Sequence, residues 1–343
     1  MKQIVQTLIG LLFCLSAAAN SPSAVIVPDG TPLGHIEYYK LPSEQEHYVS
    51  PTRYDYSKVA RSITEGCRTD FERLRAINRW IGRNIAYDTS YSIYNADDCF
   101  DHRRGVCQAY CELFYRIAEA IGIRVEIVSG TSRDIWGNVG GGHSWLFAYT
   151  RPDWGILIDP TWDAGSVSNG TFSFRKHSGS WFAVDAEWMI LRHFPKDESY
   201  QLLDKPMSRS EFESLKGGFY LCAEYGMDVH QIYVRARKHT LTLPEFYSEG
   251  EGEILGLDIP LQSTLRIGET YTFRVRLSTS REFVLQDRET RSIRSDAWNA
   301  EPDGTYTLRY TPSSEGVVIL GFRETVSQHE WRTHICVRYR VVS

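Results

Sequence analysis

Hydrophobic positions between residues 69 and 86 recur with the period of an α-helix. The apolar stripe consists of Phe71, Leu74, Ile77, Ile81 and Ile85. Residues that are spaced three and four apart share one face of a helix, so this stripe predicts a helix with one buried side. Thr69 and Glu72 have the spacing of a capping box, in which each side chain bonds the backbone N–H of the other residue. We therefore predict a helix over residues 69–86.

A second helical stripe begins at Cys107 and ends at Ile121. Its apolar members are Cys107, Cys111, Phe114, Ala118 and Ile121. Gly122 follows directly, and a glycine just beyond the last periodic residue is a common helix stop. The intervening residues 88–104 are rich in Asp, Asn and Tyr, and we expect them to form a loop.

Beyond the second helix the pattern changes to the alternation that is typical of β-strands. We predict short strands over residues 124–129, 143–149 and 155–159. A glycine-rich loop ends at residues 140–142, just before the second strand. Pro160 ends the third strand, because proline has no N–H to donate to a neighbouring strand.

The second half of the chain has a different pattern of apolar and polar residues. Residues 160–217 show no sustained period and contain a cluster of large aromatic residues: Trp162, Trp181, Phe182 and Trp188. From about residue 218, apolar and polar residues alternate over segments 232–234, 270–277, 306–310, 317–322 and 334–342. Short strands separated by turn residues favour a β-sandwich. We therefore predict an all-β sandwich domain over residues 218–343.

The first residues have the pattern of a secretory signal peptide. Lys2 gives a basic start, an apolar run extends from Leu8 to Leu15, and small residues follow at 16–19. Because the apolar run is too short to cross a bilayer as a stable helix, we expect cleavage after Ala19 and no transmembrane span. The mature chain is then expected to be secreted, periplasmic or located at the cell surface.

Cys14 raises the alternative of a bacterial lipoprotein. Phe13 stands where such a site requires a small residue, so simple export is favoured. The polar residues after the signal show scattered proline and tyrosine and no sustained period, which predicts an extended arm. The patterns therefore divide the chain into a signal peptide, an N-terminal arm, an α+β domain and a β-sandwich, over residues 1–19, 20–65, 66–217 and 218–343.

Composition and charge exclude several classes of protein. The 343 residues carry 38 Lys+Arg against 43 Asp+Glu, and 42% of the residues are hydrophobic. This balance is ordinary for a globular protein and argues against a disordered chain or a coiled coil. A net charge of -5 gives no support to nucleic-acid binding. Aromatic residues make up 13% of the chain; they favour large cores, with a groove for a peptide or a glycan as the alternative.

Three short segments carry the residue types of a cysteine-dependent acyl-transfer site. Cys107 follows Gly105 and Val106 and opens the second helix, where unpaired N–H groups and the helix dipole stabilise a thiolate. His143 begins one predicted strand, and Asp159 ends the next. A thiol nucleophile, an imidazole base and a carboxylate that orients the imidazole together make a catalytic triad.

Each of the three residues has a structural explanation when it is considered alone. A cysteine on a helix face commonly packs as a small hydrophobic residue. A histidine before a strand is commonly structural, and an Asp-Pro pair commonly starts a turn. The combination in this chain order is much more specific. It predicts that His143 deprotonates Cys107, that the thiolate attacks an amide or ester carbonyl, and that Asp159 fixes the imidazole tautomer.

Residues 69–163 resemble the core of the transglutaminase-like superfamily. The resemblance is carried by segments 84–88, 104–110, 113–114, 122–123, 142–145 and 158–162. It implies a papain-like α+β fold, in which the nucleophile helix packs against an antiparallel sheet, with Cys107, His143 and Asp159 as the triad. The segment 181–203 is also similar to material that follows this core in secreted bacterial members.

The resemblance leaves the reaction open, since the superfamily includes protein cross-linkers, cysteine peptidases, deamidases and inactive forms. An upstream side chain often assists the oxyanion in this family, which makes Tyr87 and Trp80 candidates. Gln108 and Trp145, which neighbour the nucleophile and the base in sequence, are further candidates for oxyanion or substrate contacts. Burial in the core is the alternative for the aromatic candidates.

Metal binding and disulfide formation are alternatives for the remaining cysteines. A zinc site would draw on Cys99, His102, Cys107 and Cys111, but their spacing lacks the paired short knuckles of structural zinc sites. Export permits disulfides, and the candidate pairs are Cys67 with Cys99 and Cys222 with Cys336. Cys111 is expected in the core.

The acidic residues Asp97, Asp98 and Asp101 suggest a calcium loop. No full series of ligands accompanies them, so a solvated loop is favoured. We therefore expect neither a metal ion nor another cofactor.

Together these patterns predict a secreted enzyme that transfers acyl groups from protein or peptide amides through a thioester. Hydrolysis, by a peptidase or a deamidase, is slightly favoured over cross-linking, because nothing in the sequence identifies an amine-acceptor site. The alternative is a catalytically silent scaffold whose aromatic-rich β-domain binds a cell-surface glycan or a protein.

Overall fold

The computed structural model describes residues 25–26, 32–33, 39–41, 49–175, 179–219, 221–287, 298–327 and 330–343. The expected signal peptide, with Cys14, lies outside the described residues, as does much of the expected arm. Within the arm, β1 (Val25–Ile26) pairs with β2 (Pro32–Leu33). A third short strand, β3 (Tyr39–Lys40), pairs with β8 (Trp154–Ile158).

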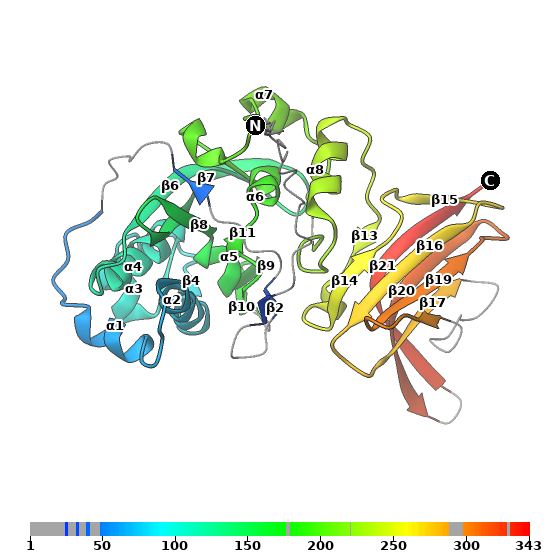
Figure 1. The fold of residues 1–343 in the computed structure, drawn as a ribbon, viewed down its shortest axis with the longest axis horizontal. Coiled ribbons are helices and arrows are strands. Elements are labelled where there is room, and N and C mark those ends of the chain that lie inside the picture. Colours follow the sequence, from blue (N-terminus) through cyan, green and yellow to red (C-terminus); the bar gives the residue numbers. More distant parts are fainter. Residues whose placement is uncertain are drawn as a thin grey trace, which may run out of the picture.

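Helices form one side of the N-terminal lobe, which comprises α1 to α7 and lies on the left in Figure 1. The first of them are α1 (Ser57–Ile63), α2 (Asp70–Asn84), α3 (Ala96–His102) and α4 (Cys107–Glu119). The expected capping box is confirmed, because Thr69 and Glu72 each accept a hydrogen bond from the backbone N–H of the other. The expected stop after α4 is also confirmed: Gly122 has a φ of 76°, which favours glycine.

The helices pack against a six-stranded antiparallel sheet. Its order is β11-β8-β7-β6-β12, with β3 on β8, where the new strands are β6 (Val125–Arg133), β7 (Val139–Arg151), β11 (Phe182–Val184) and β12 (His193–Pro195). Pairing of β6 with β7 extends to Arg133 opposite Val139. Residues 140–142, which were expected in a loop, therefore belong to β7.

Both faces of β7 are buried. Leu146 and Ala148 join residues of α2 and α4 in one core, whereas Trp145 and Phe147 join a second core on the opposite face. Alternate side chains of a strand lie on opposite faces, so one short run contributes to two cores. This double burial fixes the register of β7, because a shift of one residue would exchange the two faces.

Short elements occupy two segments that were expected to be irregular. The expected loop 88–104 contains α3 and β5 (Arg104–Gly105). The segment 160–217 contains α5 (Pro160–Ala164), β9 (Gly165–Ser168), β10 (Thr171–Phe174), β11, α6 (Ala186–Arg192), β12, η1 (Glu198–Gln201) and α7 (Arg209–Ser214). Such elements are too short to show a hydrophobic period. The helices begin instead at side-chain caps, namely Asn95, Asp159, Asp185, Asp197 and Ser208.

Two further, mainly antiparallel sheets form the C-terminal lobe, on the right in Figure 1. One contains β13 (Glu245–Phe246), β15 (Thr264–Arg266), β17 (Glu282–Asp287), β20 (Gly316–Ser327) and β21 (Glu330–Val342). The other contains β14 (Ile254–Asp258), β16 (Tyr271–Leu277), β18 (Asn299–Ala300) and β19 (Thr305–Tyr310), and η2 (Ser248–Gly250) precedes β14. The sheets meet where Phe273 of β16 and Tyr339 of β21 lie 5.9 Å apart between ring centroids.

One predicted strand is wrong. Ile232–Val234 lie in α8 (Val229–Arg237), which Asp228 caps by accepting a hydrogen bond from the N–H of Gln231. A run of three residues cannot distinguish a period of two from a period of 3.6, so the alternation there carried little information. The other alternating segments overlap β16, β19, β20 and β21, as expected.

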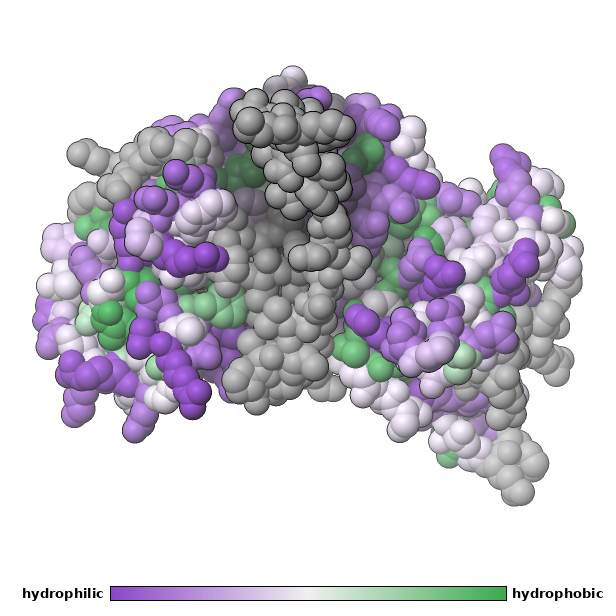
Figure 2. All heavy atoms as spheres, in the orientation of Figure 1, coloured by the Kyte–Doolittle hydropathy of each residue, from purple (hydrophilic) through white to green (hydrophobic). Residues whose placement is uncertain are grey.

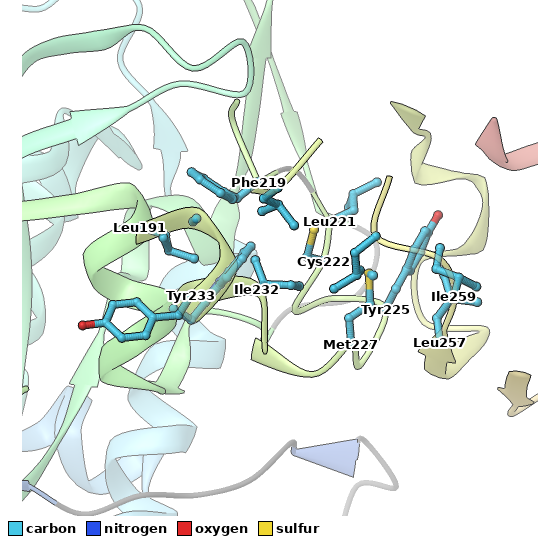
Figure 3. Close-up of a cluster of buried hydrophobic side chains, with 14 of the residues drawn as sticks. Leu191, Phe219, Leu221, Cys222, Tyr225, Met227, Ile232, Tyr233, Leu257 and Ile259 are labelled. Atoms are coloured by element: carbon cyan, nitrogen blue, oxygen red, sulfur yellow. The ribbon is translucent and has the colours of Figure 1, made fainter. Parts of the chain in front are cut away.

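A cluster of buried hydrophobic side chains, the junction cluster, lies between the two lobes. Figure 3 labels its residues: Leu191, Phe219, Leu221, Cys222, Tyr225, Met227, Ile232, Tyr233, Leu257 and Ile259. They belong to one core that extends from Trp145 in the N-terminal sheet to Phe273 in the C-terminal lobe. Since one core spans both lobes, we infer that they unfold as a single cooperative unit.

The six described cysteines are free thiols. The candidate pairs Cys67–Cys99 and Cys222–Cys336 are therefore not joined. Cys99 is buried against Gly105, whereas Cys67 is half-buried in the connection between α1 and α2. Cys111 is fully buried in the core, as expected.

Hydrophilic side chains cover most of the coloured surface of both lobes on the face shown in Figure 2, and hydrophobic ones form scattered patches. Isolated apolar residues are normal on a globular surface. Within the part of the chain that the structure describes, no helix combines the length and the apolar character needed to cross a membrane.

Replacing Ile232 by alanine tests the junction cluster. Ile232 is 0% exposed, so the cavity left by Ile232→Ala should lower the free energy of unfolding by about 2–5 kcal/mol. Urea denaturation followed by circular dichroism and by fluorescence should show one shifted transition with both probes. The exposed neighbour provides a control, since Gln231→Ala should change the free energy of unfolding by less than about 0.5 kcal/mol. Two separate transitions would contradict the single cooperative unit.

Candidate active site

Cys107 is the first residue of α4, and backbone contacts fix its position. Val106 is the N-cap and provides no side-chain hydrogen bond to the helix. Its own N–H donates to the carbonyl of Ile93 at 3.0 Å, which ties the start of the helix to the preceding loop. The N–H groups of a first helical turn lack intrahelical partners, so the thiol lies beside donors and at the positive end of the helix dipole.

Gly105 allows the chain to approach the helix closely. It lies in β5, which pairs in parallel with β4 (Ala86–Tyr87), so that Tyr87 is opposite Gly105. A Cβ at Gly105 would be 2.6 Å from the Cβ of Ala109 and 3.0 Å from Sγ of Cys99. A side chain at this position would therefore push β5 away from α4 and α3.

His143 and Asp159 come from neighbouring strands of the N-terminal sheet. His143 lies in β7, opposite Gly130 of β6. Asp159 directly follows β8 and is the N-cap of α5, where its Oδ1 accepts the backbone N–H groups of Thr161 and Trp162, both at 3.0 Å. The cap holds this carboxylate at the end of β8, beside β7.

A hydrogen bond joins His143 to Asp159, and Cys107 lies beside this pair. Nε2 of His143 lies 2.7 Å from Oδ2 of Asp159, which leaves Nδ1 as the ring nitrogen for the thiol. Cys107 lies close enough to the His143 ring and to the backbone N–H of Ser144 for both to lower the pKa of its thiol. Asp159 is 0% exposed and His143 is 8% exposed, whereas Cys107 is partly exposed. The thiol therefore lies at the solvent side of a buried His–Asp pair.

A second histidine bonds the same carboxylate. Oδ2 of Asp159 lies 2.9 Å from Nε2 of His193 as well as 2.7 Å from Nε2 of His143. An ionised carboxylate only accepts hydrogen bonds, so both imidazoles donate an N–H to it. With two bonds at each oxygen, Asp159 can remain ionised although it is buried.

These contacts favour a thiolate and an imidazolium at neutral pH. Burial alone would raise the pKa of Cys107, but the hydrogen bond and charge of His143 outweigh it and hold this pKa below its ordinary value. Burial would lower the pKa of His143, yet the charge and hydrogen bond of Asp159 raise it to about 10. Burial likewise opposes ionisation of Asp159, but His143 and His193 hold the pKa of its carboxyl below the usual range.

Tryptophans enclose the two imidazoles. The Trp162 ring centroid lies 5.4 Å from that of His143 and 4.3 Å from that of His193. The Trp145 centroid lies 6.2 Å from His143 and 5.1 Å from His193. Trp145, a candidate for substrate contact, is 0% exposed and belongs to the core. Trp162 is partly exposed, so it is the ring that faces the solvent side of the site.

Two of the other sequence candidates lie beside the nucleophile. Tyr87 is close enough to Cys107 for a thiolate there to raise its pKa, although burial contributes most to this increase. Gln108 accepts a hydrogen bond from Ser144 Oγ at 3.3 Å and donates to Glu112 Oε1 at 2.9 Å. Gln108 thus ties the first turn of α4 to the strand that carries His143.

The third candidate, Trp80, packs against α3. Its ring stacks on Phe100 with 6.2 Å between centroids. The Arg103 guanidinium lies 5.2 Å from the Trp80 ring centroid. These contacts assign Trp80 to the packing of α2 on α3.

His193 and Trp162 are the site residues to which sequence reasoning assigned no role. His193 begins β12 in a segment without a hydrophobic period, and it reaches Asp159 only through the fold. The available signal was the similarity of segment 181–203 to superfamily members, which gave no role for any single residue. Trp162 was visible only as a member of an aromatic cluster.

The acidic residues that suggested calcium bind an arginine instead. They lie in α3 and not in a loop. The Arg53 guanidinium is 3.2 Å from Asp98 Oδ1 and 2.7 Å from Asp101 Oδ2. Asp97 accepts hydrogen bonds from Thr52 Oγ1 and from the backbone N–H of Arg53, both at 2.7 Å. This network fastens the segment before α1 to α3.

A potential group of metal ligands coincides with the site. Among the described residues, His143, Asp159 and His193 place ligand atoms within 4.8 Å of one another, whereas the cysteines considered for zinc form no such group. Both Nε2 atoms already donate to Asp159.

Comparison with known proteins identifies the superfamily of the N-terminal domain. The sequence model of the transglutaminase-like superfamily matches residues 57–186. The chain contains a transglutaminase-like superfamily domain. Cys107, His143 and Asp159 all lie within the matched residues, and His193 lies beyond them.

The curated relatives include peptidases from two mammals. Kyphoscoliosis peptidase from Mus musculus is 27% identical over 171 residues, and that from Homo sapiens is 28% identical over 170 residues. Each match covers 46% of this chain and 26% of the relative. Lim and transglutaminase domain protein ltd-1 from Caenorhabditis elegans is 24% identical over 295 residues, which cover 71% of this chain and 39% of the relative. The chain thus spans about a quarter of the length of the kyphoscoliosis peptidases.

Alkylation by iodoacetamide tests the electrostatics of the site. The pKa of Cys107 lies below its ordinary value, whereas burial and Glu72 raise the pKa of half-buried Cys67. At about pH 6, Cys107 should therefore react at least ~10-fold faster than Cys67, because the thiolate is the nucleophile. Peptide mass spectrometry measures both rates in one sample. His143→Ala should remove the advantage of Cys107, and equal rates in the wild type would contradict a thiolate at this site.

Proposed function

We propose that this protein is a cysteine-dependent acyl-transfer enzyme that acts on protein or peptide amides. The observation that carries the proposal is the position of the Cys107 thiol beside the hydrogen-bonded pair of His143 and Asp159, in a transglutaminase-like domain. The named relatives that are peptidases support the same class of chemistry. In this proposal the packing of α4 on the sheet is papain-like, and the paired C-terminal sheets form a β-sandwich.

The proposed reaction uses the charges that the site holds at rest. The Cys107 thiolate attacks the amide carbonyl carbon, and the carbonyl oxygen becomes an oxyanion. The His143 imidazolium then protonates the departing nitrogen as the C–N bond breaks, which leaves a thioester. Water, deprotonated by neutral His143, next attacks the thioester and the C–S bond breaks. A primary amine in place of water would give a cross-link.

Two kinds of donor support an oxyanion beside Cys107. The first helical turn of α4 offers backbone N–H groups, including that of Cys107. The Tyr87 hydroxyl is the second donor, because burial holds its pKa above the ordinary value and keeps it protonated. In the free protein the Tyr87 ring packs edge to face against Tyr91, with 6.1 Å between the ring centroids.

The loop after β4 is built to hold a fixed shape beside the nucleophile. Asp88 is 2% exposed and accepts hydrogen bonds from the N–H and hydroxyl groups of Ser90 and Ser92. Tyr91 has a φ of 53°, a left-handed conformation that costs a non-glycine residue free energy. The side chain of Tyr91 is 62% exposed. We propose that this loop forms a wall against which the acyl part of the substrate binds.

Hydrolysis is favoured over cross-linking in this proposal, since no group in the described residues is recognisable as an amine-acceptor site. The alternative function is a silent scaffold that binds a glycan or a protein through the C-terminal lobe. Most aromatic rings of that lobe are buried, and exposed Trp331 has the Arg323 guanidinium 4.3 Å from its ring centroid. We also propose export of the mature chain, for which the signal-like pattern of residues 1–19 is the support.

Removing the nucleophile tests the proposed reaction. Wild type and Cys107→Ala would be incubated with casein and a peptide panel, each with and without a labelled primary amine. We expect peptide cleavage or ammonia release by the wild type, and a loss of at least ~1,000-fold in the variant, as for other covalent nucleophiles. Cys67→Ala is the matched control and should retain wild-type rates. Equal product from wild type and Cys107→Ala would sink the proposal, and amine incorporation would identify a cross-linker.

Tyr87→Phe tests the oxyanion donor. Loss of one such donor typically costs about 100-fold in kcat or more, so we expect a decrease of that order with little change in KM. Steady-state kinetics on the best peptide would measure it. Tyr94→Phe, which removes a hydroxyl from a side chain that is 52% exposed in the same loop, is the control. An unchanged kcat for Tyr87→Phe would assign this tyrosine to packing.

A further inference from the structure

We propose that His193 is a positioning residue of the active site, which holds Asp159 in the orientation that serves His143. The inference rests on the proposed function, because it concerns the same nucleophile. It extends the arrangement from three residues to four, in the order Cys107, His143, Asp159, His193. The fourth residue lies outside the matched residues 57–186 of the superfamily domain.

The contact between His193 and Asp159 is geometrically specific. Nε2 of His193 lies 2.9 Å from Oδ2 of Asp159, the same oxygen that accepts from His143. The other oxygen, Oδ1, is held by the start of α5 through Thr161 and Trp162. Rotation of the carboxylate would break bonds at both oxygens, so its direction toward His143 is fixed from two sides.

The protonation state of His193 follows from its surroundings. The carboxylate only accepts, so Nε2 must carry the proton. Nδ1 is buried without a hydrogen-bond partner, and a second proton there would have no acceptor. Burial lowers the pKa of His193 to about 4, and the charges of His143 and Arg192 act in the same direction, whereas Asp159 opposes them. His193 therefore donates one hydrogen bond as a neutral ring and leaves the imidazolium charge on His143.

Three tryptophans confine the His193 ring. The centroids of Trp162, Trp145 and Trp181 lie 4.3, 5.1 and 5.2 Å from that of His193. His193 is 0% exposed, so its bond to Asp159 lies in a medium where water does not compete for the carboxylate. Tight packing of this kind limits the ring to one orientation.

Apolar packing by itself does not account for a histidine here. A phenylalanine would fill a similar volume within the tryptophans and would leave no buried nitrogen unpaired, as Nδ1 of His193 is. An unpaired buried polar atom carries a cost in free energy. What the imidazole adds in return is the Nε2–H donor to Asp159.

Two substitutions distinguish the effect of the Nε2–H donor of His193 from the effect of the volume of its ring. His193→Phe keeps an aromatic ring and removes the donor, whereas His193→Gln places an amide nitrogen near the position of Nε2. We expect His193→Phe to lower kcat by about 10- to 100-fold with KM within ~2-fold, because misplacement of a catalytic group by a fraction of an ångström to an ångström has effects of this size. The kcat of His193→Gln should be at least ~5-fold higher than that of His193→Phe. Phe194→Leu, a change at the next buried residue of β12, should leave kcat near the wild-type value.

The pH profile of Cys107 alkylation gives a readout that needs no substrate. In His193→Phe, the acidic limb of the profile should move to higher pH, since a less well held Asp159 stabilises the His143 imidazolium less. His193→Gln should restore the wild-type profile. A wild-type profile and kcat in His193→Phe, or an equal loss in Phe194→Leu, would overturn the role of His193. Failure of the proposed function looks different, because wild-type Cys107 would then show no reactive thiolate.

The tautomer of His193 in the wild type provides a test that does not depend on whether a variant folds. Nitrogen-15 NMR of histidine-labelled protein should show one imidazole that stays neutral with its proton on Nε2 down to about pH 5, since burial lowers the pKa of His193 to about 4. A second imidazole, His143, should remain protonated up to high pH. A His193 that is charged at neutral pH, or protonated only at Nδ1, would contradict the proposed hydrogen bond.

Discussion

The buried carboxylate of Asp159 is the group on which the arrangement of the site depends. An isolated carboxylate in the protein interior is very costly, so the charge is compatible with the fold only while donors surround it. Those donors come from the start of α5, from β7 and from β12. Because the Asp159 carboxylate needs hydrogen bonds from all three segments, it fixes their relative positions although they are separate in sequence. Loss of a donor to an ionised group of this kind removes about 1.5–3 kcal/mol.

Packing provides the precision that the hydrogen bonds require. Because both faces of β7 are buried, its register cannot shift, and His143 is held at one position relative to α4. Two residues position α4, the helix that carries Cys107. Gln108 ties α4 to β7, and Gly105 permits β4 and β5 to lie against the helix. The core behind Trp145 continues through the junction cluster into the C-terminal lobe. The C-terminal sheets thus contribute to the rigidity of the surface on which the site is built.

The accuracy of the sequence predictions follows the length of the elements. The long helices α2 and α4 were predicted from their apolar stripes, and the caps at Thr69 and Gly122 predicted their ends. In the C-terminal lobe, β16, β19, β20 and β21 were predicted from their alternation, whereas β14 and β17 were not. Short elements were not: α3 was taken for a loop, and Ile232–Val234 in α8 for a strand. A period cannot be recognised when an element is hardly longer than the period itself.

For the candidate site too, local sequence features predicted some residues, and others were found only in the folded structure. The sequence by itself determined the candidate residues Cys107, His143 and Asp159, because each was expected at the end of a predicted element and their order resembles that of a known superfamily. Only the tertiary structure placed His193 on Asp159, assigned Trp145 to the core and Trp162 to the solvent side, and turned the suspected calcium ligands into partners of Arg53. The physical reason is that periodicity and capping are local, whereas the partners of a buried charge are set by which segments the sheet order brings together.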